Sequence, residues 1–220
     1  MTRVKICGVR SLDNALMAAA AGADLIGLNF YPPSPRSLEL ASARKIVQGL
    51  RLALGADCPT LVGVFVNESV ADMRRLMTAV GLDFAQLSGD EPPETVAALH
   101  GAAFKAIRPR TPGAAAKAVA EYAASFPPDE RAPSLLVDAH HPRLYGGSGE
   151  TTSLTVAAKI QPEAPRLMLA GGLTPDNVAE RVRAIRPWGV DVASGVESGS
   201  AGHKDERKLR AFIQAVWSAS

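Results

Sequence analysis

Short apolar runs alternate regularly with alanine-rich stretches from one end of the chain to the other. Apolar runs of this length are typical of buried strands, and the longer alanine-rich stretches favour helices. The eight strand candidates are residues 4–7, 25–29, 60–66, 84–87, 104–107, 134–138, 166–170 and 190–193. The eight helix candidates are residues 11–21, 41–53, 69–80, 93–99, 113–125, 153–160, 175–185 and 204–217.

Hydrophobicity within the strand candidates is continuous rather than alternating, which indicates a parallel sheet that is covered on both faces. Eight strand–helix units in 220 residues predict an α/β fold, a single (βα)8 TIM barrel that occupies residues 1–220 as one domain. A doubly wound open sheet is the structural alternative. No GxGxxG motif follows the first strand candidate, which argues against a dinucleotide-binding sheet.

A weak internal repeat also favours the barrel. Three helix candidates are followed by a glycine and, two residues later, an aspartate; the pairs are Gly22 and Asp24, Gly81 and Asp83, and Gly189 and Asp191. Glycine readily adopts the left-handed conformation that closes a helix. The same helix-to-strand connection, repeated three times, is typical of an architecture built from βα units.

Composition argues against several classes of partner. The net charge is only +2, lysine and arginine are scattered, and aromatic residues make up 5%, so we expect no nucleic-acid partner. The sequence shows no signal peptide and no apolar run long enough to cross a membrane. Its two cysteines, Cys7 and Cys58, form no CxxC motif, so we expect a reduced, cytoplasmic protein. A monomer and a homodimer are both compatible with the sequence.

Cys7 and Asp138 are the candidate catalytic residues. Each stands at the carboxyl end of a strand candidate, the first and the sixth, and in a barrel that end carries the chemistry. A thiol and a carboxyl that face each other across a small substrate suit general acid–base catalysis. Taken singly, Cys7 fits a small buried apolar side chain better than a catalytic thiol, and Asp138 fits a loop-capping carboxylate better than a catalytic acid. Their shared position in the barrel favours the catalytic interpretation.

Small residues follow the last two strand candidates, with Gly171 and Gly172 after the seventh and Ser194 and Gly195 after the eighth. Such residues let backbone N–H groups approach an anion, and the loops after strands seven and eight of a barrel often bind phosphate. Gly171 and Gly172 alone would fit a tight turn. Because Ser194 and Gly195 occupy the matching position, we expect a phosphate site and a small phosphorylated substrate as the partner.

Two arginines follow strand candidates, Arg36 after the second and Arg108 after the fifth. For each, two interpretations are equally compatible with the sequence: contact with an anionic substrate group, or a solvated loop arginine. We expect no metal site, because His140 and His141 alone supply too few ligands at a suitable spacing.

Six segments carry a resemblance to a known family. They are VKICG at 4–8; GADLIGLNF at 22–30 with SPR at 34–36; VGVFVN at 62–67; LLVD at 135–138 with GGSG at 146–149; LAGGLTPDNV at 169–178; and GVDVASGVE at 189–197 with GHKD at 202–205. In this order, and at consistent strand–helix positions, they resemble phosphoribosylanthranilate isomerases of the tryptophan pathway. One segment would be a weak match, whereas six over nearly the whole chain are specific.

The resemblance implies an aldose–ketose isomerase that converts N-(5-phosphoribosyl)anthranilate into 1-(2-carboxyphenylamino)-1-deoxyribulose 5-phosphate by an Amadori rearrangement, without a metal or an organic cofactor. It implies that Asp138 is the general acid on the furanose ring oxygen and that Cys7, as a thiolate, removes the proton from C2. The phosphate would bind backbone N–H groups at Gly172 and Gly195, and Arg36 would orient the anthranilate.

The sequence departs from the family pattern at three places. Ser88 stands where the family usually has histidine, Ser148 where threonine is common, and residues 150–154 (ETTSL) where a basic or polar residue and then Phe-Asp-Trp are common. Two other functions stay open. A related aminoaldose isomerase of the histidine pathway would be expected to carry a carboxylate in place of Cys7, and a non-catalytic barrel would bind a phosphorylated metabolite without turnover.

Overall fold

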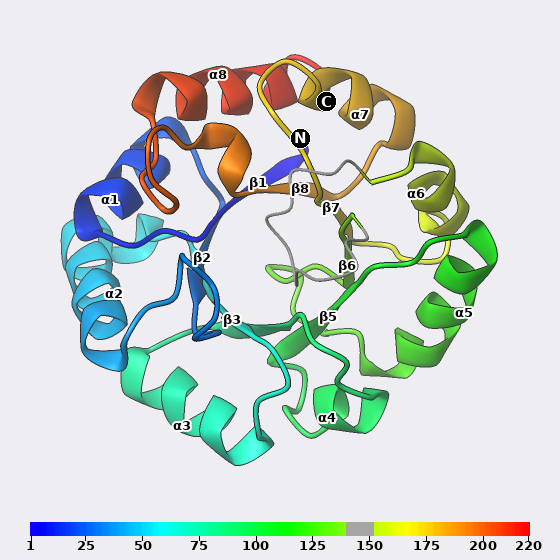
Figure 1. The fold of residues 1–220 in the computed structure, drawn as a ribbon, viewed down its shortest axis with the longest axis horizontal. Coiled ribbons are helices and arrows are strands. Elements are labelled where there is room, and N and C mark those ends of the chain that lie inside the picture. Colours follow the sequence, from blue (N-terminus) through cyan, green and yellow to red (C-terminus); the bar gives the residue numbers. More distant parts are fainter. Residues whose placement is uncertain (140–151) are drawn as a thin grey trace.

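Eight parallel strands close into a barrel that helices α1–α8 surround (Figure 1), in a computed structural model that describes residues 1–139 and 152–220. The strands are β1 (Arg3–Cys7), β2 (Leu25–Asn29), β3 (Thr60–Phe65), β4 (Phe84–Leu87), β5 (Ala103–Ile107), β6 (Leu135–Val137), β7 (Leu167–Leu169) and β8 (Gly189–Val192). The helices are α1 (Leu12–Ala21), α2 (Leu40–Leu54), α3 (Val70–Val80), α4 (Pro93–Ala97), α5 (Pro112–Tyr122), α6 (Leu154–Ile160), α7 (Val178–Ile185) and α8 (Glu206–Trp217). Strands follow each other around the barrel in chain order, and β1 pairs with β8, so the predicted TIM barrel is confirmed.

Helices α1 and α3 each begin one residue after the predicted start, because the first predicted residue, Ser11 or Ser69, caps the helix from outside. Ser11 and Ser69 each accept a backbone N–H of the following turn through the side-chain oxygen, at 3.2 and 3.0 Å. Among the helix starts, that of α7 departs furthest from the prediction, since it lies at Val178 rather than at residue 175. The Asn177 amide accepts the Thr174 N–H and donates to the Gly172 carbonyl, which holds this segment in a turn.

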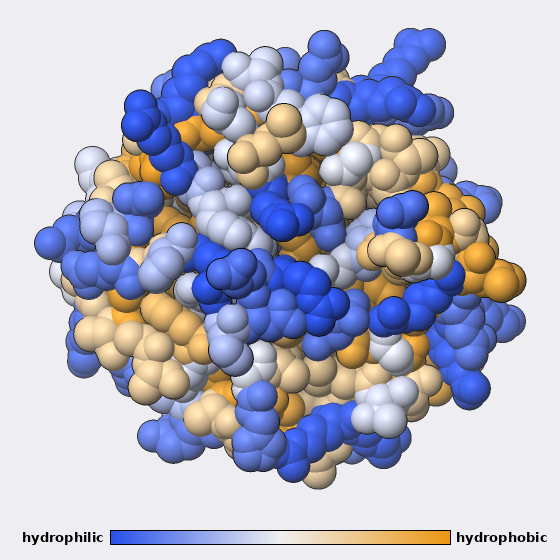
Figure 2. Space-filling model, turned by 180° about the vertical axis from the view of Figure 1, so that it is seen from behind, coloured by the Kyte–Doolittle hydropathy of each residue, from blue (hydrophilic) through white to orange (hydrophobic). Residues whose placement is uncertain are grey.

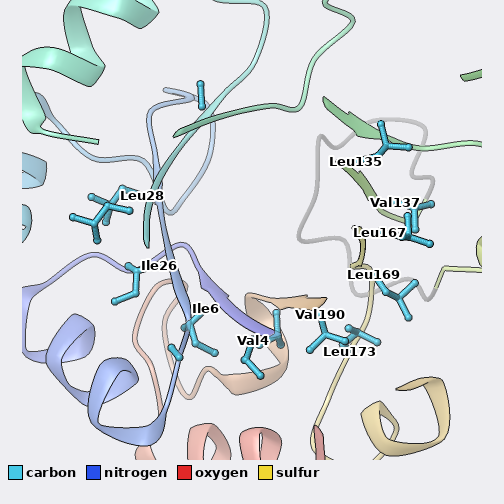
Figure 3. Close-up of a cluster of buried hydrophobic side chains, with 14 of the residues drawn as sticks. Val4, Ile6, Ile26, Leu28, Leu135, Val137, Leu167, Leu169, Leu173 and Val190 are labelled. Carbon is cyan, nitrogen blue, oxygen red and sulfur yellow. The ribbon is translucent and has the colours of Figure 1, made fainter. Parts of the chain in front are cut away.

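Alternation along each strand separates an outer from an inner set of side chains, because successive residues point to opposite faces. Val4 and Ile6 of β1, together with Ile26 and Leu28 of β2, belong to the core between barrel and helices (Figure 3). The inner set forms a second apolar cluster, which contains Leu25, Val62, Phe84, Phe104, Ala106, Ala132, Leu136, Met168 and Ala170. The barrel is therefore filled with side chains below the ends of its strands.

The registers at β1 place particular residues side by side inside the barrel. Lys5 lies opposite Asp191 of β8, and Cys7 lies opposite Gly27 of β2. Since Val4 and Ile6 point outward, Lys5 and Cys7 point inward. The polar residues of β1 and β8 thus project into the barrel rather than toward the helices.

The face opposite to that of Figure 1 carries hydrophilic side chains at its middle and separate hydrophobic patches around them (Figure 2). Large exposed hydrophobic side chains in the described ranges include Met1, Leu52 and Trp217. No helix within residues 1–139 and 152–220 combines the length and apolarity that a membrane span needs.

Candidate active site

Two adjoining pockets at the carboxyl ends of the strands share the side chains of Asp138 and Asp191 and the loop residue Ala193. The first pocket is also lined by Cys7, Gly8, Asn29, Ser34, Arg36, Val64, Gln86 and Ser88. The second is also lined by Ala170, Gly171, Gly172, Leu173, Val192, Ser194 and Gly195. Larger hollows of about 380 and 630 Å³ lie elsewhere, and neither Cys7 nor Asp138 lines them. The predicted thiol, carboxyl and glycine-rich loops therefore meet in one region.

Cys7 ends β1 with its thiol in the first pocket. Burial raises the pKa of this thiol above its usual value, the charge of Lys5 opposes that effect, and the charge of Asp191 adds to it. On the other side of the residue, the Lys204 ammonium donates to the Cys7 carbonyl oxygen at 2.6 Å. Two buried ammonium groups therefore lie close to Cys7.

Asp138 follows β6 directly, and the register that points Leu136 into the barrel points Asp138 inward as well. Burial raises the pKa of the carboxyl to about 6, although Oδ1 accepts a hydrogen bond from the Ala139 N–H at 2.8 Å, which lowers it. The charge of the Asp191 carboxylate contributes to the same rise in pKa. Asp138 can therefore hold a proton much closer to neutral pH than an ordinary aspartate can.

The glycines after β7 and β8 are required by their surroundings. Gly171 and Gly172 have φ angles of +88° and +59°, a region that favours glycine. A Cβ on Gly195 would lie 1.9 Å from the Leu173 carbonyl oxygen, so any side chain there collides with backbone. Within the part of the chain that the structure describes, the N–H groups of Gly171 and Gly172 have no hydrogen-bond acceptor. The second pocket is thus bordered by backbone donors suited to an anion.

Arg36 lies in the first pocket, and its side chain is 13% exposed, unlike that of a solvated loop arginine. Its Nε and Nη2 donate to both carboxylate oxygens of Glu197, at 2.9 and 2.7 Å. The Lys204 ammonium binds the same carboxylate at 2.8 Å. Glu197 thus fixes the guanidinium in the first pocket, and this ion pair does not involve Nη1.

Arg108 lies outside the two pockets. Its guanidinium donates to the Ser88 carbonyl and lines the 380 Å³ hollow beside β5 and α5. Its charge still lowers the pKa of Asp138. The structure therefore separates the two arginines that the sequence left equivalent.

Four polar residues near the pockets escaped the sequence analysis as site residues: the buried Lys5, Gln86 and Lys204, and the largely buried Asp191. Gln86 donates to the Ser88 hydroxyl at 3.1 Å, while its Oε1 is buried without a hydrogen-bond partner among the described residues. A polar residue within an otherwise apolar strand was the available signal for Lys5, Gln86 and Asp191.

Some predictions concern residues 140–151, which lie outside the described part of the chain. They are the interpretation of His140 and His141, the glycine-rich segment 146–149 with Ser148, and the departures at residues 150 and 151. Among the described residues, no group of three or more histidine, cysteine, aspartate or glutamate side chains is arranged to hold a metal ion.

Comparisons with known proteins agree on one family. The family described as N-(5'phosphoribosyl)anthranilate (PRA) isomerase matches residues 4–215. N-(5'-phosphoribosyl)anthranilate isomerase of Roseiflexus sp. (strain RS-1) is 46% identical, and the match covers 100% of both chains. The crystal structure of phosphoribosyl anthranilate isomerase from Thermotoga maritima superimposes with a TM-score of 0.85 at 31% identity, over 99% of this chain and 100% of that one. A further isomerase structure, in complex with reduced 1-(o-carboxyphenylamino)-1-deoxyribulose 5-phosphate, has a TM-score of 0.81 at 29% identity over 99% and 100%.

Proposed function

The chain belongs to the N-(5'-phosphoribosyl)anthranilate isomerase family, and from this premise we propose that Cys7 and Asp138 perform the proton transfers of its reaction. The enzyme isomerises N-(5-phosphoribosyl)anthranilate to 1-(2-carboxyphenylamino)-1-deoxyribulose 5-phosphate in tryptophan biosynthesis. The observation that supports the two roles is that the thiol and the carboxyl line one pocket, next to the glycine-rich backbone after β7 and β8.

Asp138 acts first, as the general acid. It donates its proton to the furanose ring oxygen while the C1–O bond breaks, and the nitrogen lone pair forms the C1=N bond of an open-chain iminium. A pKa near 6 makes the protonated carboxyl accessible close to neutral pH. The charge that develops on the leaving oxygen is thus neutralised by proton transfer.

Cys7 acts second, as a thiolate base. It removes the proton from C2, the electron pair of that C–H bond forms the C1=C2 bond, and the C1=N π pair returns to nitrogen, which gives an enaminol. C1 then gains a proton and the C2 hydroxyl loses one, which gives the ketone. Protons alone move between groups, so the sequence of steps is balanced without an external oxidant or reductant.

Three other contacts position the substrate. The phosphate binds the backbone at Gly172 and Gly195, which places the sugar between acid and base. Arg36 Nη1 meets the anthranilate carboxylate, and the unpartnered Gln86 Oε1 accepts the substrate N–H. A solved relative that holds a reduced deoxyribulose 5-phosphate analogue supports a small phosphorylated ligand of this kind. We also propose a cytoplasmic enzyme, which the unpaired thiols of Cys7 and Cys58 support, because free thiols fit a reducing compartment.

Turnover without added metal is the direct test of this function. Purified protein is expected to accelerate the decay of anthranilate fluorescence from freshly generated phosphoribosylanthranilate, at the same rate with and without excess EDTA. A chelator-sensitive rate that divalent metal restores would contradict the metal-free mechanism. Absence of decay above background would instead favour a barrel that binds phosphorylated metabolites without turnover.

A Gly195→Ala substitution is expected to weaken phosphate binding and to destabilise the fold. The added methyl group would collide with the Leu173 carbonyl, and overpacking of this kind costs about 1–3 kcal/mol. Affinity for the ketose phosphate product, measured by calorimetry, should fall at least about tenfold, and the melting temperature should fall as well. Gly113→Ala on α5 is the matched control, because nothing lies within 4 Å of its Cβ position. Equal product affinity in Gly195→Ala and wild type would remove this loop from the phosphate site.

A further inference from the structure

We propose that Lys5 is a positioning residue for the base of the reaction: its buried ammonium, anchored by Asp191, stabilises the thiolate form of Cys7. The inference rests on the proposed role of Cys7 as the base. Lysine is seldom fully buried unless it is paired, and Lys5 is 0% exposed in the middle of a strand. Lys5 takes no part in the proton transfers by Asp138 and Cys7.

Strand geometry aims the lysine at the thiol. Lys5 and Cys7 are two residues apart on β1, so both point into the barrel, with Lys5 one layer deeper. Asp191 lies directly opposite Lys5 on β8, and its Oδ1 accepts the Lys5 Nζ at 2.8 Å. An ammonium has three N–H donors, and the ion pair with Asp191 uses one of them. Asp191 therefore fixes Lys5 and leaves capacity for a second anion.

Gly27 on the other neighbouring strand provides the space. It pairs with Cys7, and a Cβ built on it would lie 2.9 Å from Cys7 Sγ and 3.1 Å from Lys5 Nζ. Thiol and ammonium therefore flank one small space that any larger residue on β2 would fill. The ammonium is close enough for its charge to lower the pKa of the thiol.

The charged groups around the thiol come from four elements besides β1. They are Arg36 after β2, Asp138 after β6, Asp191 on β8, and Lys204 before α8 with its partner Glu197. Glu197 neutralises part of the charge of both Arg36 and Lys204. Burial opposes the thiolate, and among the charged groups Lys5 lowers the pKa of Cys7 most, ahead of Lys204. Lys5 is thus the main charge that offsets the cost of burying the thiolate.

The test is a pH titration of thiolate absorbance in the ultraviolet, in a Cys58→Ser background so that one thiol reports. Lys5→Met is expected to move the Cys7 titration upward by at least about one pH unit. It should also lower kcat at least about tenfold at neutral pH, with recovery as pH rises. A merely structural lysine would change stability without moving this titration.

Lys5→Met leaves the Asp191 carboxylate, which is only 10% exposed, without its partner and is expected to be less stable, so a double variant accompanies it. Lys5→Met/Asp191→Asn should still titrate above wild type, since Lys5 affects the thiol more than Asp191 does. Lys105→Met/Glu91→Gln removes another buried ion pair, joined at 2.8 Å outside the two pockets, and should leave the titration unchanged.

The outcomes distinguish the role of Lys5 from the role of Cys7 as the base. A Cys7 titration that is unchanged in both Lys5 variants would overturn the role of Lys5. A titration that shifts while the pH profile of kcat stays unchanged would overturn the role of Cys7 as the base, and with it the inference. Parallel shifts of both are the expected result.

Discussion

A Cys7→Ala variant is expected to lose about 10²–10⁴-fold in kcat while it binds the ketose phosphate product as tightly as the wild type. The loss follows because no other described group in the first pocket can take the place of the thiolate at C2. Asp138 is committed to the ring oxygen, and Asp191 is held by Lys5. Affinity should persist because the contacts to phosphate and anthranilate come from other residues.

Single-turnover fluorescence decay and product calorimetry measure the two quantities separately. Cys58→Ala is the matched control, since this second cysteine is half-buried near Arg51 and Asp83, away from both pockets. It should retain turnover within about twofold. A Cys7→Ala enzyme that keeps turnover within tenfold of wild type would show that another group removes the C2 proton.

The fold was predictable from the sequence because each strand is short and largely apolar, and because a helix separates it from the next strand. Continuous hydrophobicity reports burial on both faces, and eight repeats leave few architectures other than the barrel. The errors lie at the ends of elements. Helix α7 begins three residues late because Asn177 binds Gly172 and Thr174, an interaction that residue propensities do not contain.

The site was predictable where position alone decides it. Cys7 and Asp138 follow strands, and the barrel brings strand ends together. The ion pairs that tune the site were not predictable in this way. Lys5 meets Asp191, 186 residues later, only because β1 pairs with β8 when the barrel closes. Arg36 meets Glu197 across 161 residues for the same reason.

An Asp138→Asn variant is expected to lose about 10²–10⁴-fold in kcat, because an amide cannot deliver a carboxyl proton to the ring oxygen. The fluorescence decay that the wild type shows should therefore be nearly abolished. Asp72→Asn on α3 is the control, since this carboxylate is exposed and pairs with Arg75. Decay in Asp138→Asn within tenfold of wild type would contradict the role of Asp138 as the acid.

The pH dependence of the wild type follows from the same carboxyl. The pKa of Asp138 is about 6, and that of the Cys7 thiol is raised above its usual value. Between these two pKa values most of the free enzyme carries an Asp138 carboxylate and a Cys7 thiol. The reactive form carries a protonated Asp138 and a Cys7 thiolate, and it is a constant fraction of the enzyme over this pH range. kcat/KM should therefore fall below pH about 6 and again above the pKa of the thiol.

Asp138→Asn is also expected to be more stable than the wild type at neutral pH, by about 1–3 kcal/mol. Burial raises the folded-state pKa above the unfolded value near 4, so the unfolded chain releases this proton first as pH rises. The wild type therefore loses stability between pH about 4 and 6, whereas the amide does not titrate. Denaturant unfolding of both proteins across this interval measures the difference. If the difference in stability between the two proteins is the same at pH 4 and at pH 7, Asp138 ionises freely in the fold. A carboxyl of that kind would be a poor acid.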